Sequence, residues 1–234
     1  MVLGLGRFNL RQYNAQYYEI YTVRRNTDLN KIPSFRWIKR MLDLQPGERL
    51  LDAGSGDGNL LRFLSEGVDV EGVGVDSADP AISIAQSSYP TLKFIKADLR
   101  QLPFPAGHFD KVVCFNVIEH ITEQETVMRE FQRILKPGGK IILGTNIRDS
   151  ICWWLYQKTI GEHTHVREFT AKEFVRFVSG FFELKSSAKT SGVFRFPRLF
   201  IWIFHYFLKG DILVLATRNY FHSVNSSSNS SARK

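Results

Sequence analysis

The sequence predicts an α/β protein built on a doubly wound, mostly parallel sheet. An apolar strand runs into a glycine-rich turn and then a helix, and a second strand ends in an acid about twenty residues later. Further apolar runs alternate with helical patterns along the chain. The first of these units is residues 50–64, which read LLDAGSGDGNLLRFL. We expect this unit to organise the sheet.

The spacing of the glycines separates this turn from a dinucleotide-binding loop. Gly54, Gly56 and Gly58 follow Asp52 at alternate positions, and Asn59 stands where a dinucleotide loop would carry its third glycine. Glycines let the backbone approach a ligand, and the start of a helix offers free N–H groups to an anionic group. A turn without a ligand is the alternative interpretation of a glycine-rich segment alone.

The pattern D-x-G-x-G-x-G resembles that of class I S-adenosylmethionine-dependent methyltransferases, in their small-molecule, type 11-like branch. Residues 129–143, which read REFQRILKPGGKIIL, are also typical of this family. The resemblance implies S-adenosyl-L-methionine as cofactor, with its methionine carboxylate at the helix start and with Asp52, Gly54, Gly56 and Gly58 among the binding residues. It also implies a Rossmann-like sheet of seven strands, in which the last strand is antiparallel and lies beside the fifth.

The hydrophobic pattern assigns the elements in chain order. Strands are expected near 50–52 and at 68–75, 92–97, 109–115, 140–145, 181–187 and 211–217, and helices at 34–44, after Gly58, from Asp79, and at 123–135 and 171–179. Thr170 and Glu173 have the spacing of a capping box at the start of the last helix.

Two acids follow the second and third predicted strands. Asp76 stands where such folds place a ribose-binding carboxylate, and we group it with Ser77 as cofactor-binding. Alternatively, Asp76, Ser77 or Asp79 caps the next helix. In the family an acid at the position of Asp98 accepts from the adenine amino group, while the N–H of the next residue, here Leu99, meets the ring. A turn residue is the alternative for Asp98.

The segment after the fourth predicted strand should face the reacting methyl group, because doubly wound sheets bind ligands beyond the carboxyl ends of their strands. We assign Asn116 to the cofactor and Glu119 to the substrate. His120, His163 and His165 are candidate catalytic bases, because histidine titrates near neutrality. A histidine that only holds a loop by hydrogen bonds is the alternative.

Residues 116–120 also indicate whether the protein uses a metal ion. Some O-methyltransferases of the quinone pathway and of the small-RNA 2′-O type carry E-x-x-E-H and a later histidine, which bind a divalent ion. Here Asn116 replaces the first glutamate, which removes an anionic ligand from a site for a hard cation. We therefore predict no metal.

The regions at the two ends carry weaker signals. Residues 1–45 are predicted to form an N-terminal helical lid, with Tyr17 and Tyr18 contacting substrate by resemblance, although the tyrosine stripe can equally pack on the domain. The methyltransferase domain is expected at 46–220, and the Ser/Asn-rich residues 221–234 are expected to be a disordered polar tail.

An aromatic insertion is expected at 190–209, between the last two strands. The apolar part of 194–209 is about half the length needed to cross a bilayer. Its aromatic and basic residues suit a helix at a membrane interface or the wall of an apolar acceptor pocket, and we assign Trp202 to the substrate. A buried helix or a dimer contact is the alternative.

Composition sets broad limits on the partners. The 234 residues carry a formal net charge of +8, which fits nucleic acid, an anionic membrane surface or an acidic substrate. The basic residues are scattered rather than gathered with aromatics on one stripe, so nucleic acid is unlikely as a partner. Two cysteines and no recognisable export signal indicate a reducing compartment, and we expect a cytoplasmic protein with peripheral membrane contact.

Together these features predict a methyltransferase that transfers a methyl group to an oxygen atom of a small acceptor. We expect this acceptor to be hydrophobic or membrane-associated. RNA methylation is an alternative that the basic charge suggests. A non-catalytic subunit that binds S-adenosylmethionine is a second alternative.

Overall fold

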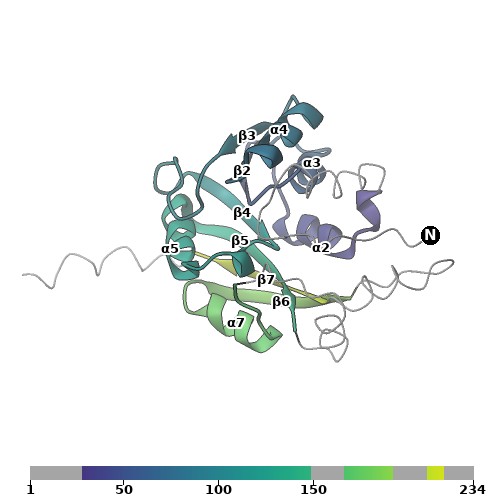
Figure 1. Ribbon diagram of the computed structural model, residues 1–234. Helices are drawn as coiled ribbons and strands as arrows, with labels where there is room; N and C mark the ends of the chain where they lie inside the picture. Colours follow the sequence, from purple (N-terminus) through teal and green to yellow (C-terminus); the bar gives the residue numbers. More distant parts are fainter. Residues whose placement is uncertain (1–27, 149–165, 192–209, 219–234) are drawn as a thin grey trace, which may run out of the picture.

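Two layers of helices enclose a seven-stranded sheet in the computed structural model, which describes residues 28–148, 166–191 and 210–218 (Figure 1). The strands are β1 (Arg49–Ala53), β2 (Glu71–Asp76), β3 (Lys93–Lys96), β4 (Phe109–Phe115), β5 (Leu135–Ile147), β6 (Glu183–Ser191) and β7 (Gly210–Thr217). The helices are α2 (Pro33–Leu42), α3 (Asn59–Ser65), α4 (Asp79–Ser88), α5 (Gln124–Ile134) and α7 (Ala171–Ser179), with short 3-10 turns η2 (Leu29–Lys31) and η3 (Ile118–His120).

The strand order is β3-β2-β1-β4-β5-β7-β6. The pairs from β3 to β5 are parallel, whereas β7 is antiparallel to both β5 and β6. This confirms the predicted Rossmann-like, doubly wound sheet and the position of the last strand beside the fifth.

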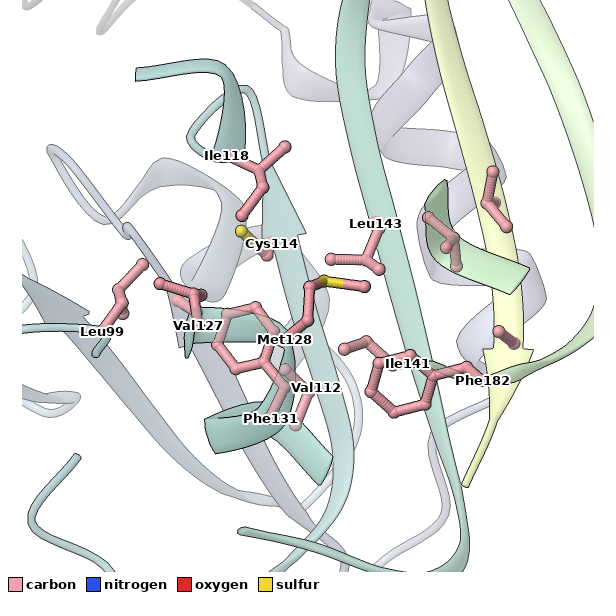
Figure 2. Packing of buried hydrophobic residues seen from close by; sticks show 14 of the residues in the cluster. Leu99, Val112, Cys114, Ile118, Val127, Met128, Phe131, Ile141, Leu143 and Phe182 are labelled. Carbon is pink, nitrogen blue, oxygen red and sulfur yellow. The ribbon is translucent and has the colours of Figure 1, made fainter. Parts of the chain in front are cut away.

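Neighbouring residues on the central strands point to opposite faces of the sheet, as the period of a strand requires. Leu51 and Val112 belong to the apolar cluster that includes Phe131 of α5, as Figure 2 shows around Val112. Leu50 and Val113 belong to the cluster on the other face, which α2, α3 and α4 cover. These continuous apolar runs are what a sheet buried on both faces needs.

The position of β1 fixes where a ligand can bind. β1 lies between β2 and β4, so the strand order runs outward from β1 in opposite directions. β2 and β3 lie on one side of β1, and β4 and β5 lie on the other. In doubly wound sheets this switch point opens a crevice beyond the carboxyl ends of the strands. The glycine turn, Asp76 and Asn116 all follow these strand ends.

Several strand boundaries differ from the predicted ones, and β6 covers Glu183–Ser191 rather than 181–187. β2 begins at Glu71 rather than residue 68, because the chain at Val68 is still turning, its N–H donating to Ser65 O at 3.4 Å. β5 begins at Leu135, which pairs with Phe109, so the Lys-Pro-Gly-Gly segment ends α5 as expected but lies within a strand. A register shift in β4 after Phe109 accommodates it.

α7 begins as predicted. The Thr170 side chain accepts from the N–H of Glu173 at 3.1 Å, and the Glu173 carboxylate accepts from the N–H of Thr170 at 2.7 Å, which completes the capping box. Within the part of the chain that the structure describes, no helix is both long and apolar enough to span a bilayer.

The domain limits stay predictions. The predicted lid lies outside the described residues except for 28–45, where Ile38 and Leu42 of α2 are fully buried against the sheet. The predicted tail and most of the aromatic insertion also lie outside them.

Candidate active site

The glycine turn joins β1 to α3 and is fastened to the end of β2. All three glycines have positive φ, 82° at Gly54, 52° at Gly56 and 82° at Gly58, a region that favours glycine. The N–H groups of Gly54 and Ser55 donate to Val75 O at 2.7 and 2.9 Å. The turn is therefore held across the strand ends by backbone contacts that side chains at Gly54 or Gly58 would disturb, since a Cβ there would overlap Val117 or Phe94.

Asp76 connects this turn to the next helix. Its Oδ2 accepts from Gly56 N at 3.0 Å and its Oδ1 accepts from Ala78 N at 2.9 Å. No side chain caps α4, so neither Ser77 nor Asp79 has the capping role considered above. Each carboxylate oxygen keeps a further acceptor position, which leaves Asp76 able to bind a pair of hydroxyls.

Asp52 lies beneath the turn and is 1% exposed. Its Oδ2 is buried without a hydrogen-bond partner. Burial, and to a lesser extent the charge of Asp76, raises the pKa of Asp52 to about 7, although the N–H of Leu61 acts in the opposite direction.

Asp98 follows β3 and is held by a residue that the sequence analysis did not single out. The Arg100 guanidinium donates to the Asp98 carboxylate, with Nη2 2.6 Å from Oδ2, and reaches Glu123 Oε2 at 3.1 Å. The hydrogen bond from Arg100 lowers the pKa of Asp98 below its ordinary value. Leu99 is buried beside it. The spacing Asp-x-Arg was the sequence signal that could have indicated this contact of Arg100. The contact of Asp98 with the adenine stays a prediction.

The segment after β4 carries two further buried polar side chains. Asn116 has φ 55°, its N–H donates to Gly144 O at 2.9 Å, and its Oδ1 is buried without a partner. Glu119 is fully buried in η3, and neither carboxyl oxygen has a well-aligned hydrogen bond. Burial raises the pKa of Glu119 to about 7, while its own N–H, the Thr145 hydroxyl and the N–H of Asn146 act in the opposite direction.

Residues 166–169, which precede α7, lie against η3 and the end of β5. The N–H groups of Val166 and Arg167 both donate to Glu119 O, at 2.9 and 3.1 Å. Phe169 pairs with Ile147 at the end of β5 and is fully buried. The segment before α7 is thus attached to the same strand ends as the glycine turn.

The structure brings the glycines, Asp52, Asp76, Asn116 and Glu119 to one edge of the sheet, with Ser77, Asp98, Leu99 and His120 following the same strand ends. The other assigned residues, His163, His165, Tyr17, Tyr18 and Trp202, lie outside the described residues. In the ranges that the structure describes, no group of three or more His, Cys, Asp or Glu could hold a metal ion.

The buried polar atoms at the carboxyl ends of the strands indicate whether the residues there fit a polar ligand. Asp52 Oδ2, Ser55 Oγ and Asn116 Oδ1 are buried without partners at the ends of β1 and β4. Buried polar groups are rarely left unpaired without a functional reason. Their position around the glycine turn fits the amino-acid and sugar groups of a nucleoside such as S-adenosylmethionine.

Glu119 makes stability depend on pH. Its pKa rises on folding from the ordinary 4.5 to about 7, so its stabilising contribution is fully present below about pH 4.5 and is lost as the pH rises through 7. We expect the free energy of unfolding of the wild type, relative to Glu119→Gln, to fall by about 2–3 kcal/mol from pH 5 to pH 8. Urea unfolding of both proteins at several pH values measures this, and parallel profiles would contradict it.

Comparison with known proteins agrees with the predicted family and fold. A family model described as a methyltransferase domain matches residues 51–143. Phosphoethanolamine N-methyltransferase 3 of Arabidopsis thaliana is 36% identical over 107 residues, which cover 44% of this chain and 22% of that protein. Demethylmenaquinone methyltransferase of Thermus thermophilus is 34% identical over 127 residues, which cover 49% of this chain and 58% of that protein.

A solved structure extends the fold comparison beyond the matched segment. The complex between the Haloferax volcanii Trm112 methyltransferase activator and a methyltransferase contains a chain that superposes with a TM-score of 0.68 at 17% identity, covering 87% of this chain and 98% of that one. This chain spans less than two thirds of the length of the two curated relatives. Residues 51–143 carry both the matched family and the glycine turn, so the chain contains a class I S-adenosylmethionine-dependent methyltransferase domain.

Proposed function

We propose that this protein transfers a methyl group from S-adenosylmethionine to an oxygen of a small acceptor, which is hydrophobic or membrane-associated. The observation that carries the proposal is the set of unpartnered buried polar atoms of Asp52, Ser55 and Asn116 around the glycine turn. They lie at the switch point of the sheet, where such folds bind nucleosides.

The residues of the chain act mainly by positioning. The glycine turn would hold the amino-acid end of the cofactor, Asp76 the ribose hydroxyls, and Asp98 with Leu99 the adenine. When bound, the cofactor supplies a methyl group on a sulfonium, whose departure as a neutral thioether needs no acid. Alignment of the acceptor with that methyl group, and exclusion of water, is then the main contribution of the protein.

An oxygen acceptor also needs a base. A hydroxyl group that took up the methyl group would have to give its proton to a residue of the chain. Glu119, with a pKa of about 7, and the neighbouring His120 stand after β4, where the methyl group is expected. His163 and His165 are proposed as further bases on the sequence pattern alone.

The small acceptor is supported by the names of the relatives, which are a phosphoethanolamine and a demethylmenaquinone methyltransferase. The basic and aromatic residues of 194–209, Trp202 included, support contact with a lipid-like acceptor or a membrane surface. We therefore propose a cytoplasmic protein that works at a membrane, with Tyr17 and Tyr18 over the acceptor.

The experiment is methyl transfer from S-adenosylmethionine labelled in its methyl group. Candidate acceptors are a hydroxylated quinol, a phenol, phosphoethanolamine and transfer RNA. Label on the oxygen of a quinol or phenol supports the proposal. Label on carbon or nitrogen overturns the choice of oxygen, label only on RNA overturns the small acceptor, and binding without transfer to any acceptor favours a non-catalytic subunit.

A further inference from the structure

Two neighbouring acids at the glycine turn have different surroundings. Burial raises the pKa of Asp76 above its ordinary value, but its two carboxylate oxygens accept from Ala78 N and Gly56 N, which favours the ionised form. Asp52 is fully enclosed, and its Oδ2 has no partner at all. An ionised oxygen in that position would be costly, since a buried charge needs hydrogen bonds or an opposite charge.

The sheet register places the two acids close together. Asp52 pairs with Gly74, and Asp76 lies two residues further along β2, so both side chains project from the same face at diagonal positions. A buried carboxylate and a half-buried one on diagonal positions of neighbouring strands resist joint ionisation. The burial of Asp52 and the charge of Asp76 together hold the pKa of Asp52 near 7.

Among the residues that the structure describes, no positively charged side chain acts on the pKa of Asp52. Asp57, in the turn, raises the pKa of Asp52 further, and α3 contributes only the N–H of Leu61. On the β4 side lies Cys114, a buried thiol whose own pKa is raised by burial and by the charges of Glu119 and Asp52. In the described part of the site, a bound ligand is the remaining source of positive charge.

We propose that Asp52 carries a proton in the free protein and releases it when the cationic nucleoside S-adenosylmethionine binds, so that binding strengthens as the pH rises. The O–H bond of the Asp52 carboxyl breaks, the proton passes to the buffer, and the carboxylate that remains offsets the positive charge of the ligand. This rests on the proposed function, because it requires S-adenosylmethionine at the glycine turn.

The test is calorimetric titration of the protein with S-adenosylmethionine in two buffers of different ionisation enthalpy. The difference in heat gives the number of protons released on binding. We expect about half a proton per bound molecule at pH 7, falling toward zero at pH 8, because a group with a pKa of about 7 is half protonated at pH 7. Asp52→Asn should release none.

Asp79→Asn is the control, because Asp79 is an acid that follows Asp76 closely in the chain but is exposed and pairs with Lys96 at 2.7 Å. It should release as many protons as the wild type. Release that persists in Asp52→Asn, or that disappears in Asp79→Asn, overturns the assignment to Asp52.

A second measurement, made on the wild type alone, tests the proposal if Asp52→Asn does not fold. The infrared difference spectrum of the wild type on binding should lose the C=O band of a protonated carboxylic acid. Binding heat without proton release and without loss of that band overturns this inference and leaves the proposed function intact. The absence of any binding heat would instead refute the proposed function.

Discussion

Gly54→Ala is expected to weaken S-adenosylmethionine binding at least about 100-fold. An alanine at φ 82° costs about 1–2 kcal/mol in backbone energy alone. Its Cβ would also lie 2.3 Å from Val117 Cγ2 and 2.8 Å from Val117 Cγ1, so either the turn or the segment before Glu119 must move. Calorimetric titration with S-adenosylmethionine measures the loss.

Gly47→Ala is the control for the backbone cost. Gly47 has φ 80°, but a Cβ there would meet nothing within 4 Å, and it precedes β1 at the opposite end of the strand. We expect it to lower stability and leave binding unchanged. Adding Val117→Ala to Gly54→Ala should restore part of the affinity by removing the overlap. Wild-type affinity in Gly54→Ala would show that the contact with Val117 does not shape the site.

Asp76→Ala is expected to lower the affinity for S-adenosylmethionine by about 100-fold or more. The change removes the acceptor for Gly56 N and for Ala78 N, so two N–H groups lose partners at the turn and at the start of α4. Each such loss costs about 1–3 kcal/mol where water cannot replace the partner. The proposed contact with the ribose hydroxyls is lost as well.

Asp79→Ala is the control for Asp76→Ala. Asp79 is an exposed acid on the same segment whose carboxylate pairs with Lys96 at 2.7 Å on the surface. Surface pairs of this kind contribute little, so we expect affinity within about twofold of wild type. The thermal shift produced by S-adenosylmethionine should vanish for Asp76→Ala and persist for Asp79→Ala. Equal shifts in the two variants would remove Asp76 from the cofactor site.

The sequence carries most of the fold because the relevant signals are local. The glycine turn, the capping box of α7 and the apolar runs of the central strands are each encoded in neighbouring residues, and the structure shows them, with several strand ends shifted by a few residues. The insertion of the last strand beside the fifth was implied by resemblance to a family. No local pattern in Asp211–Thr217 specifies that neighbour.

Contacts between segments that are far apart in the chain could not be predicted from the sequence. The Nζ of Lys39 in α2 donates to Phe63 O at 2.9 Å and to Glu66 O at 2.7 Å at the end of α3. The amphipathic pattern of α2 identifies its buried face, and it contains no information on which carbonyls lie beside its edge. The ion pair between Arg100 and Glu123 has the same origin, because only the folded chain brings these two residues within 3.1 Å of each other.

The unpaired buried oxygens of Asp52 and Asn116 are a further feature that the sequence does not predict. Both residues were assigned to the cofactor from the sequence, yet the sequence does not reveal that one oxygen of each is sealed from water and unpaired. Burial depends on how α3 and η3 close over the strand ends, which is a property of the whole packed domain.

The position of β7 has a consequence for synthesis on the ribosome. β7 is the last strand in chain order but lies between β5 and β6, both of which emerge earlier (Figure 1). Until Gly210–Thr217 leaves the exit tunnel, β5 has an open edge and β6 has no neighbour in the sheet. While residues 148–209 are being synthesised, the edge strand β5 therefore lacks its partner β7. A stalled or shortened product would expose this unpaired apolar edge to other chains in the cell.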